Sequence, residues 1–552
     1  MTSSRTSFAR LVDLYYRSWF RFHPETAVDV GVSGYEQRLT PYADDDLGAL
    51  VALNEKLLAS LDEIDPTELD EDRQLDHQVL YGAALIELEE LRESDWRYHD
   101  PCRYLPVHAV HQLFMRPVAD FRSAFVSRVG QIPEYLRGAR AHLGETPELV
   151  PEPWLESAIA EAEAGAAYLR ELHHHPRVRT AVGDSDSLHL QLDAAARALS
   201  GYARWLADEV APQAAGSFAC GERHFRRLLA HRHFLDVTPD QLHGFGRRLA
   251  EETEAEMERA CRELTGDDDV PAALAQLRRQ RPQPSELMAA YREAMGEAQR
   301  FVRDRDLATV PERHRLDVTE TPSYLRHKIP FAAYVGPAPG DPDQQAYYYV
   351  TPPGSEDELA EHNHAGIALT SCHEAWPGHH LQFVKANSQP ASRSLPRLLN
   401  ASSTLYEGWA LYGESLMCSE GFMQRPETEL LMLRDRLWRA LRVMLDVELH
   451  RGELALGEAA QRLVQTLGFS EQQARGELAW YTRAPAVPMG YATGWALIRA
   501  LRGHVLGDHR TDLKAFHDRL LASGSVALPL ALRHNFGEHA WQTARAEVFA
   551  EL

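Results

Sequence analysis

The sequence predicts a mainly α-helical protein, a large multi-helix body with a small β insert and a central cleft. First, apolar residues recur three and four positions apart through most of the chain, as on the buried face of a helix. Second, prolines, tyrosines and β-branched residues replace that pattern near the middle. Third, 552 residues with 44% hydrophobic and 25% charged content suffice for a large core and argue against disorder.

Helical periodicity predicts most of the elements on both sides of the insert. Thr238-Pro239-Asp240 and Pro284-Ser285-Glu286 have the form of helix starts, which supports two of them. The helices expected before the insert cover 47–63, 67–93, 107–127, 153–172, 185–210, 239–264 and 285–305. Those expected after it cover about 362–385, 397–419, 427–451, 470–481 and 487–506.

The insert is marked by proline and by one aromatic run. Six prolines fall between Pro311 and Pro342, and residues 346–350 read Ala-Tyr-Tyr-Tyr-Val, which predicts a strand. We therefore expect three parts: a helical N-terminal half (1–305), a strand-bearing insert (306–360) and a helical half that carries the chemistry (361–552). The two halves are expected to pack with a cleft between them.

Charge and composition exclude some partners. The net charge of −23 argues against nucleic acid, because phosphate binding needs clustered Lys and Arg. No stretch approaches the roughly 18–20 uninterrupted apolar residues of a membrane span, so no membrane contact is predicted. Arg10, Asp13 and Arg17 interrupt any signal-peptide core, and the five scattered cysteines do not form a disulfide framework. We expect a cytoplasmic protein.

The main candidate for chemistry is the segment from His373 to His380. His373-Glu374 begins like the H-E-x-x-H zinc helix, but Pro377 occupies the position of the second ligand. In a straight helix His379 and His380 would lie about 9 and 10.5 Å along the axis from His373, too far to share one ion. Pro377 and Gly378 are expected to bulge the helix and bring one of the two histidines to the one-turn position.

A third ligand is expected from Glu407, within Leu405-Tyr-Glu-Gly-Trp-Ala410 on a later helix. Its Glu-Gly-x-Ala pattern is similar to the downstream ligand helix of glutamate-type zinc peptidases. Two histidines and a glutamate leave a position for water, as catalytic zinc requires. Glu374 is the candidate general base, and Glu414 a candidate partner for a ligand histidine.

These motifs resemble the bacterial domain-of-unknown-function 885 family, whose members are described as zinc peptidases or lipoproteins. The family pattern H-E-x-x-P-G-H implies His379 rather than His380 as the second ligand. A late segment differs, because Val487 stands where the family usually has glutamine, which leaves any substrate contact of that glutamine in question. The resemblance rests on His23-Pro-Glu-Thr-Ala27, Thr321-Pro322, Tyr347-Tyr348, His373-Glu374, Pro377-Gly378-His379, Glu407-Gly-Trp-Ala-Leu-Tyr412 and Phe516-His-Asp518.

Other residues are candidates for contact with substrate. Tyr491 and His450 are expected to stabilise an oxyanion. Arg442, on one helix face with His450, and Arg483 are candidate clamps for a substrate carboxylate. Tyr348 lies in the predicted strand, which is expected to pair with an extended substrate backbone. An ion pair on a solvated face for Arg442, and simple packing for Tyr491, stay open as alternatives.

The predicted function is zinc-dependent hydrolysis of amide bonds, with short peptides or peptide-like molecules as substrates and Glu374 as proton acceptor. Two alternatives stay open. One is a metal-dependent amide or ester hydrolase that modifies a small metabolite. The other is a non-catalytic helical protein that binds a metal or ligand, which Glu374 disfavours because a structural zinc site would be closed by a fourth protein ligand.

Overall fold

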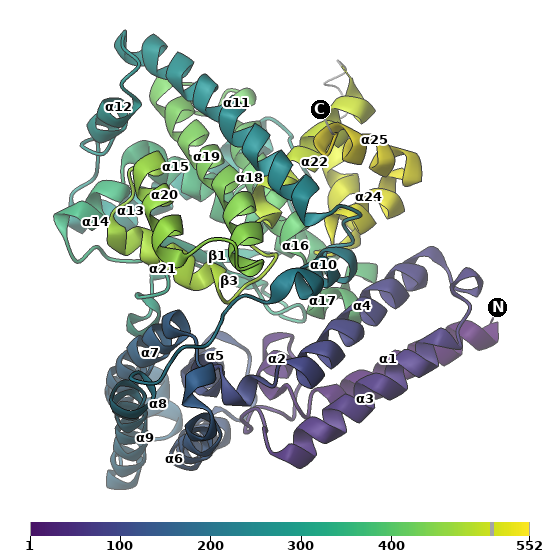
Figure 1. Cartoon of the computed structure of the whole chain (residues 1–552), viewed down its shortest axis with the longest axis vertical. Coiled ribbons are helices and arrows are strands. Elements are labelled where there is room, and N and C mark those ends of the chain that lie inside the picture. The colour runs from purple at the N-terminus through teal and green to yellow at the C-terminus, as the bar shows by residue number, and fades with distance from the viewer. Residues whose placement is uncertain (1, 508–512, 551–552) are drawn as a thin grey trace. The chain divides into compact units, whose positions relative to one another are not determined.

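The computed structural model describes residues 2–507 and 513–550 (Figure 1). Helices dominate, and one three-stranded sheet is present among the described residues. The prediction of a mainly α-helical protein with a small β insert is therefore confirmed. In the same ranges, no helix combines the length and apolar character that crossing a membrane requires.

The chain forms two compact units. Unit 1 comprises Met1–Phe218, Pro322–Lys328 and Ala338–Asp341, and unit 2 comprises Ala219–Thr321, Ile329–Pro337 and Pro342–Leu552. Residues 219–305 therefore belong to the same unit as residues 361–550. The sequence-predicted site residues all lie in unit 2.

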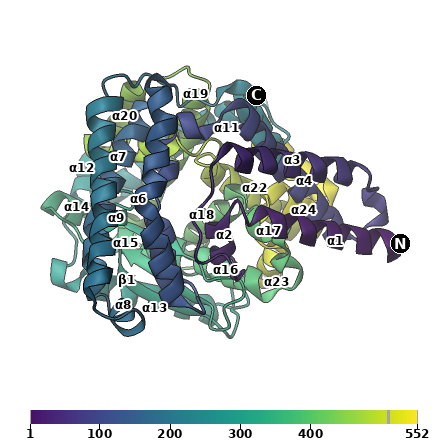
Figure 2. The same ribbon diagram turned by 90° about the horizontal axis from the view of Figure 1, so that it is seen from below.

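Unit 1 is helical. Its helices α6, α7 and α9 pack alongside one another over a core that includes Val129, Leu169 and Leu199 (Figure 2). The His23-Pro24 motif opens α2, and the His23 ring stacks on Trp19 with ring centroids 3.7 Å apart. The helices are α1 (Thr2–Trp19), α2 (Pro24–Asp29), α3 (Asp44–Asp62), α4 (Glu71–Glu93), α5 (Val107–Met115), α6 (Phe121–Glu145), α7 (Glu152–Glu171), α8 (Pro176–Ala181) and α9 (Asp186–Trp205).

Unit 2 contains the sheet and the helices from α10 onward. In Figure 1, α11 runs beside α19, and α18 packs against α15, α16 and α22. The helices are α10 (Gly221–His231), α11 (Pro239–Thr265), α12 (Val270–Leu277), α13 (Leu287–Asp304), α14 (Glu356–Glu361), α15 (His364–Glu374), α16 (His379–Ser388), α17 (Leu395–Leu399), α18 (Ser403–Ser419), α19 (Pro426–His450), α20 (Leu456–Leu467), α21 (Glu471–Tyr481), α22 (Gly490–Leu506), α23 (Leu513–Leu520), α24 (Leu528–Phe536) and α25 (Glu538–Val548).

The sheet places its predicted strand in the centre. β3 (Gln345–Val350) pairs in parallel with β1 (Arg315–Glu320) and antiparallel with β2 (Ala332–Val335). Both edges of β3 are therefore occupied, so the expectation that it pairs with a substrate backbone is wrong. Tyr348 is fully buried, with its ring against Tyr291 and its hydroxyl 3.4 Å from Ser371 Oγ. It is a core residue of the sheet.

Two predicted helices away from the His373–His380 segment are interrupted at prolines or capping residues. The helix expected over 107–127 is α5 and α6, separated at Pro117, and a new cap forms where the Asp120 carboxylate accepts from Ser123 N–H at 3.0 Å. The helix expected over 397–419 is α17 and α18, and Ser402 caps the second. Periodicity alone does not mark such breaks, because apolar residues recur at helical spacing on both sides of them.

Candidate metal centre

The chain breaks between the two histidines instead of bulging within one helix. α15 ends at Glu374 and α16 begins at His379, so the predicted single helix over 362–385 with a bulge is wrong. Gly378 N–H donates to Cys372 O at 2.9 Å, and a Cβ on Gly378 would lie 1.8 Å from His373 O. Only glycine permits so close a return of the backbone. The break lets the first residue of α16 face the last turn of α15.

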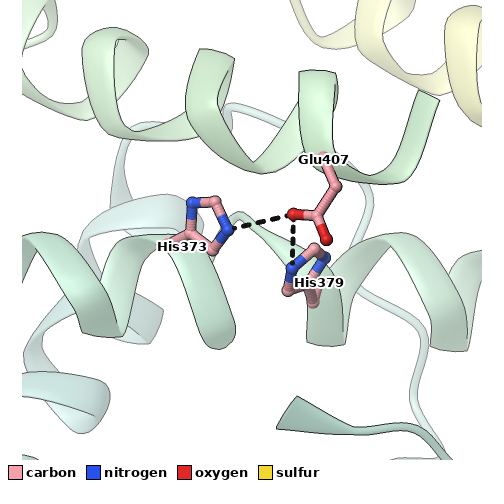
Figure 3. A group of neighbouring side chains, drawn as sticks. All are labelled: His373, His379 and Glu407. Carbon is pink, nitrogen blue, oxygen red and sulfur yellow. Dashed lines mark hydrogen bonds and ion pairs between the residues drawn. The ribbon is translucent and has the colours of Figure 1, made fainter. Parts of the chain in front are cut away.

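Three side chains, those of His373, His379 and Glu407, converge across this break (Figure 3). We call them the triad. Nε2 of His373 and Nε2 of His379 lie 3.3 and 3.2 Å from the same oxygen, Oε2 of Glu407 on α18. Charge-assisted hydrogen bonds are usually 2.7–2.9 Å long. Donors about 2.05 Å from a tetrahedral zinc ion are about 3.3 Å apart, which matches these two separations.

The donor set fits zinc on further grounds. The three groups each offer one ligand atom, and these atoms all lie within 4.8 Å of one another. Two imidazole nitrogens and one carboxylate oxygen, with a fourth position for water, form a donor set used by catalytic zinc. Nδ1 of His379 is buried without a hydrogen-bond partner among the described residues, so this histidine has no contact like that of Glu414 with His373.

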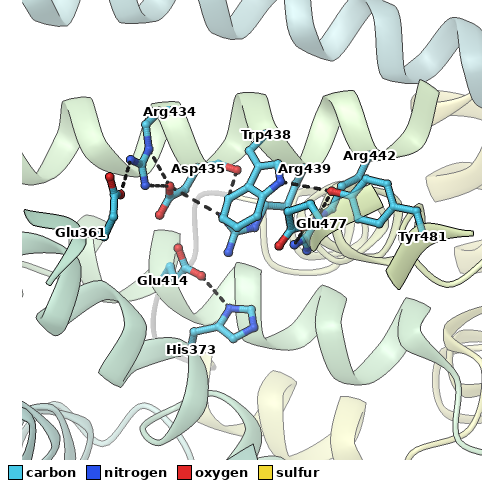
Figure 4. Close-up of polar contacts among 10 residues, drawn as sticks. All are labelled: Glu361, His373, Glu414, Arg434, Asp435, Trp438, Arg439, Arg442, Glu477 and Tyr481. Carbon is cyan, nitrogen blue, oxygen red and sulfur yellow. Dashed lines mark hydrogen bonds and ion pairs between the residues drawn. The ribbon is translucent and has the colours of Figure 1, made fainter. Parts of the chain in front are cut away.

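Glu414 supports the first histidine. Its Oε1 lies 2.7 Å from Nδ1 of His373, and because a carboxylate only accepts, Nδ1 carries the proton and Nε2 is left for a ligand role. Figure 4 shows this pair, with both side chains nearly inaccessible. Burial lowers the pKa of His373, but hydrogen bonds to Glu407 and Glu414 raise it to about 10. A metal ion bound at Nε2 of His373 would therefore displace a proton.

Glu407 and Glu374 have different electrostatic environments. Burial alone would raise the pKa of Glu407, but the charge of His379 and the hydrogen bond to His373 hold it well below its usual value. Burial raises the pKa of Glu374, and the two histidines only partly oppose this. Glu374 is half-buried, and the main influences on its pKa are burial and the charges of the nearby histidines and glutamates, with no hydrogen bond among them.

A glycine crossing brings Tyr491 to the same place. A Cβ on Gly408 would lie 2.5 Å from Cα of Gly494, so these residues let α18 and α22 touch. Glu407 precedes one glycine, and Tyr491 lies one turn before the other. The Tyr491 ring stacks on His373 at 6.1 Å between centroids. Burial raises the pKa of Tyr491 well above its usual value, and Glu407 raises it further.

His380 faces away from the triad. Its Nδ1 lies 3.1 Å from the hydroxyl of Tyr334 and its Nε2 lies 3.3 Å from His314. Burial lowers its pKa to about 3, which is typical of a neutral, packed imidazole. Of the two histidines left open by spacing, the structure brings His379 to His373 and Glu407.

Arg442 lies behind Tyr491 rather than beside the triad. Its guanidinium is 4.5 Å from the Tyr491 ring centroid, and it donates to Tyr481 Oη and Glu477 at 2.9 Å each (Figure 4). These contacts give no support to the predicted role of Arg442 as a clamp for a substrate carboxylate. The alternative was an ion pair on a solvated face, whereas the ion pair of Arg442 with Glu477 is buried. Arg483 is half-buried in the turn after α21, and its clamp role stays a prediction.

The predicted oxyanion role of His450 has no support in its contacts. The side chain is fully buried, and Nε2 lies 3.0 Å from the carbonyl oxygen of Tyr481, to which it donates. On the same helix, Asp446 accepts from the N–H groups of Ala486 and Met489 at 3.1 and 3.0 Å. Arg442, Asp446 and His450 thus hold the segment that leads into α22, and only Arg442 reaches Tyr491.

Three aromatic residues at the site were not predicted. Tyr334 on β2, Phe383 on α16 and Tyr406 on α18 surround the His379 ring. Two of them had a local signal, because Phe383 follows His379 by four residues and Tyr406 precedes Glu407. Tyr334 had none, since its position depends on sheet pairing.

Comparison with known proteins identifies a family and solved structures of similar fold. The family described as "Bacterial protein of unknown function (DUF885)" matches residues 24–534. A protein from Shewanella oneidensis, described as a candidate lipoprotein of unknown function, has a TM-score of 0.76 at 22% identity, covering 95% of this chain and 98% of that one. A candidate lipoprotein from Colwellia psychrerythraea has a TM-score of 0.79 at 18% identity, covering 98% and 99%.

A carboxypeptidase structure shows only low similarity to the chain. An M32 carboxypeptidase from Deinococcus radiodurans R1 aligns over 99% of this chain and 100% of its own, at 13% identity and a TM-score of 0.42. A score of that size carries no inference. No curated protein matches the chain.

The comparisons correct the predicted location. Both proteins with the higher TM-scores are described as candidate lipoproteins, a class attached to a membrane surface through lipid. The cytoplasmic assignment is therefore wrong. It rested on the absence of an apolar N-terminal core and of paired cysteines, and neither absence determines where a folded chain is delivered.

Proposed function

The chain belongs to the bacterial protein family of unknown function DUF885, and we propose that it is a zinc-dependent hydrolase of amide bonds in short peptides or peptide-like molecules. The observation that carries the proposal is the convergence of His373, His379 and Glu407 on one point. A structural zinc site would be closed by a fourth protein ligand. Here the group of candidate ligands among the described residues consists of three side chains, and Glu374 is not among them.

The zinc ligands and Glu374 would have different roles in such a reaction. Zinc bound by His373, His379 and Glu407 would supply a Lewis acid for the substrate carbonyl and an acidified water. Glu374 follows a ligand directly in sequence and would take a proton from the attacking water and return it to the leaving amine.

Two further side chains, those of Glu414 and Tyr491, would assist this reaction. Glu414 fixes the tautomer of His373 through its 2.7 Å contact with Nδ1. The phenol of Tyr491 is the candidate donor to the carbonyl oxygen as negative charge builds on it. Its ring is held between His373 and Arg442, which limits its motion.

The experiment is hydrolysis of a synthetic short-peptide pool by zinc-loaded protein, followed by mass spectrometry with and without a chelator. Glu374→Gln keeps the shape of the side chain but cannot accept the proton, so we expect zinc to be retained and the rate to fall roughly 10²–10⁴-fold. Glu471→Gln, at an exposed position on α21, is the matched control and should keep the wild-type rate. Equal cleavage by wild type and Glu374→Gln would contradict the proposed role.

A further inference from the structure

A partly exposed aromatic surface lies beside the ligand His379. It consists of Tyr334, Phe383 and Tyr406, which we call the aromatic wall. The Phe383 ring centroid is 5.8 Å from that of Tyr334 and 6.2 Å from that of Tyr406, so the three rings are continuous. The His379 ring lies within 6.3 Å of all three. Any group that reaches the triad past His379 therefore meets aromatic carbon.

Two residues of the aromatic wall are close in sequence to the metal ligands and lie on the same helices. Phe383 is one turn after His379 on α16, and Tyr406 immediately precedes Glu407 on α18. The Tyr334 hydroxyl contacts Nδ1 of His380 at 3.1 Å, which fixes the tyrosine ring parallel to His379, at an interplanar angle of 25°. The wall is therefore rigid in relation to the triad, as a selective pocket requires.

The exposure of these rings differs from that of the aromatic residues around them. Trp376, Trp409 and Tyr412 are each 1% exposed or less and belong to the core. Tyr334, Phe383 and Tyr406 are only half-buried. Apolar rings left partly open next to a reactive site are typical of a ligand-binding surface, because covering them with an apolar group is favourable.

Local charge indicates which side chain would cover the wall. Glu407 and Arg232 act on Tyr406 with charges of opposite sign, so neither an acidic nor a basic side chain meets an unopposed partner charge at the wall. A charged side chain of either sign would lose hydration against three rings, and the Glu407 carboxylate is already engaged by the two histidines. A large apolar side chain, above all an aromatic one, has no such penalty and can stack on the rings.

We propose that the aromatic wall is the specificity subsite of the centre and binds a large apolar side chain adjacent to the scissile amide. This inference rests on the proposed hydrolase function, because it takes the triad as the position of the scissile bond. Phe383 is the central residue, since it contacts both other rings and His379.

The test separates binding from turnover. The protein carries Glu374→Gln, is loaded with zinc, and is titrated by calorimetry with two blocked tetrapeptides that differ only in phenylalanine or alanine at one internal position. We expect the phenylalanine peptide to bind about 10- to 100-fold more tightly, from the burial of one large apolar side chain. Adding Phe383→Ala should remove that preference while zinc content stays at the parent level.

Matched variants guard against a general loss of folding. Phe422 is also half-buried in unit 2, where it packs on Phe301 with ring centroids 5.2 Å apart, away from the triad. Phe422→Ala should keep the preference, and Phe383→Leu should keep most of it. Equal affinity of the parent for both peptides, or a preference that survives Phe383→Ala, would overturn the subsite.

Failure of the hydrolase proposal can be distinguished from failure of the subsite proposal. In the first case the wild-type protein would cleave neither peptide. A phenylalanine preference that depends on Phe383 would still establish the wall as a binding surface, whereas cleavage without any phenylalanine preference would overturn the wall and leave the hydrolase intact.

Discussion

Replacing Glu414 tests whether the contact behind His373 serves a metal ligand. The carboxylate is 2% exposed, and its Oε1 lies 2.7 Å from Nδ1 of His373, whose other nitrogen faces Glu407. Loss of such an outer partner typically weakens metal binding 10- to 100-fold, or about 1.4–2.7 kcal/mol. A hydrogen bond to a charged group contributes about 1.5–3 kcal/mol, which is the same size.

Two substitutions give a graded expectation. Glu414→Gln keeps a neutral acceptor and should weaken zinc binding about 10-fold, whereas Glu414→Ala removes the acceptor and should weaken it about 100-fold. The assay is competition for zinc between the metal-stripped protein and a chromophoric chelator, with circular dichroism to show that each variant is folded. Glu471→Gln is the control for loss of a carboxylate at an exposed site. Wild-type zinc affinity in both Glu414 variants would refute the reasoning.

Two further predictions concern the frame around the centre. Gly408→Ala places a methyl group 2.5 Å from Cα of Gly494, so α18 and α22 must separate, and denaturant unfolding should show a loss of about 1–3 kcal/mol together with weaker zinc binding. Gly457→Ala on α20, where a Cβ meets nothing within 4 Å, should instead raise stability by about 0.5–1 kcal/mol, and the reverse order would contradict the crossing argument. Asp518→Asn should cost about 2–4 kcal/mol at neutral pH because it leaves Lys385, 6% exposed, without its carboxylate partner, and the partial exposure of Asp518 keeps the cost below that of a fully buried pair. Burial opposes the shift, but Lys385 lowers the pKa of Asp518, so this contribution is complete above the unfolded value of about 3.9 and is lost as pH falls through the folded value. The unfolding curves of wild type and Asp518→Asn should therefore converge in acid, and a constant gap across pH would contradict the pairing.

Local signals predicted the long helices well. The helix expected over 239–264 is Pro239–Thr265, and that over 427–451 is Pro426–His450. Both combine a strong 3.6-residue period with a proline in the first turn, and the first also has a Thr238 capping box. Such signals act within one turn, so sequence alone contains them.

What the sequence could not predict depends on contacts between distant segments. The strand expected over 346–350 is Gln345–Val350, but its central place in the sheet depends on pairing with Arg315–Glu320 and Ala332–Val335. The same holds for Tyr334, which reaches His379 only because β2 pairs with β3. The exchange of a bulge for a complete break at residues 375–378 depends on the return of Gly378 to Cys372 O.

Residue spacing predicted only part of the triad. His373 and Glu407 were expected from residue type and order, whereas spacing left His379 and His380 open. The structure distinguishes them by their partners: His379 meets Glu407 at 3.2 Å, and His380 meets Tyr334 and His314. The predicted roles of Arg442 and His450 relied on a shared helix face, and that face proves to pack inward against Glu477 and the Tyr481 backbone.

The most direct test of the central claim is the zinc content of two neighbouring variants. Wild-type protein incubated with zinc, desalted and subjected to elemental analysis should hold about one zinc per chain. His379→Ala removes a donor and should lose it, whereas His380→Ala, whose imidazole faces Tyr334 and His314, should retain most of it. Stoichiometric zinc in His379→Ala, or its loss in a folded His380→Ala alone, would contradict the metal centre described for this chain.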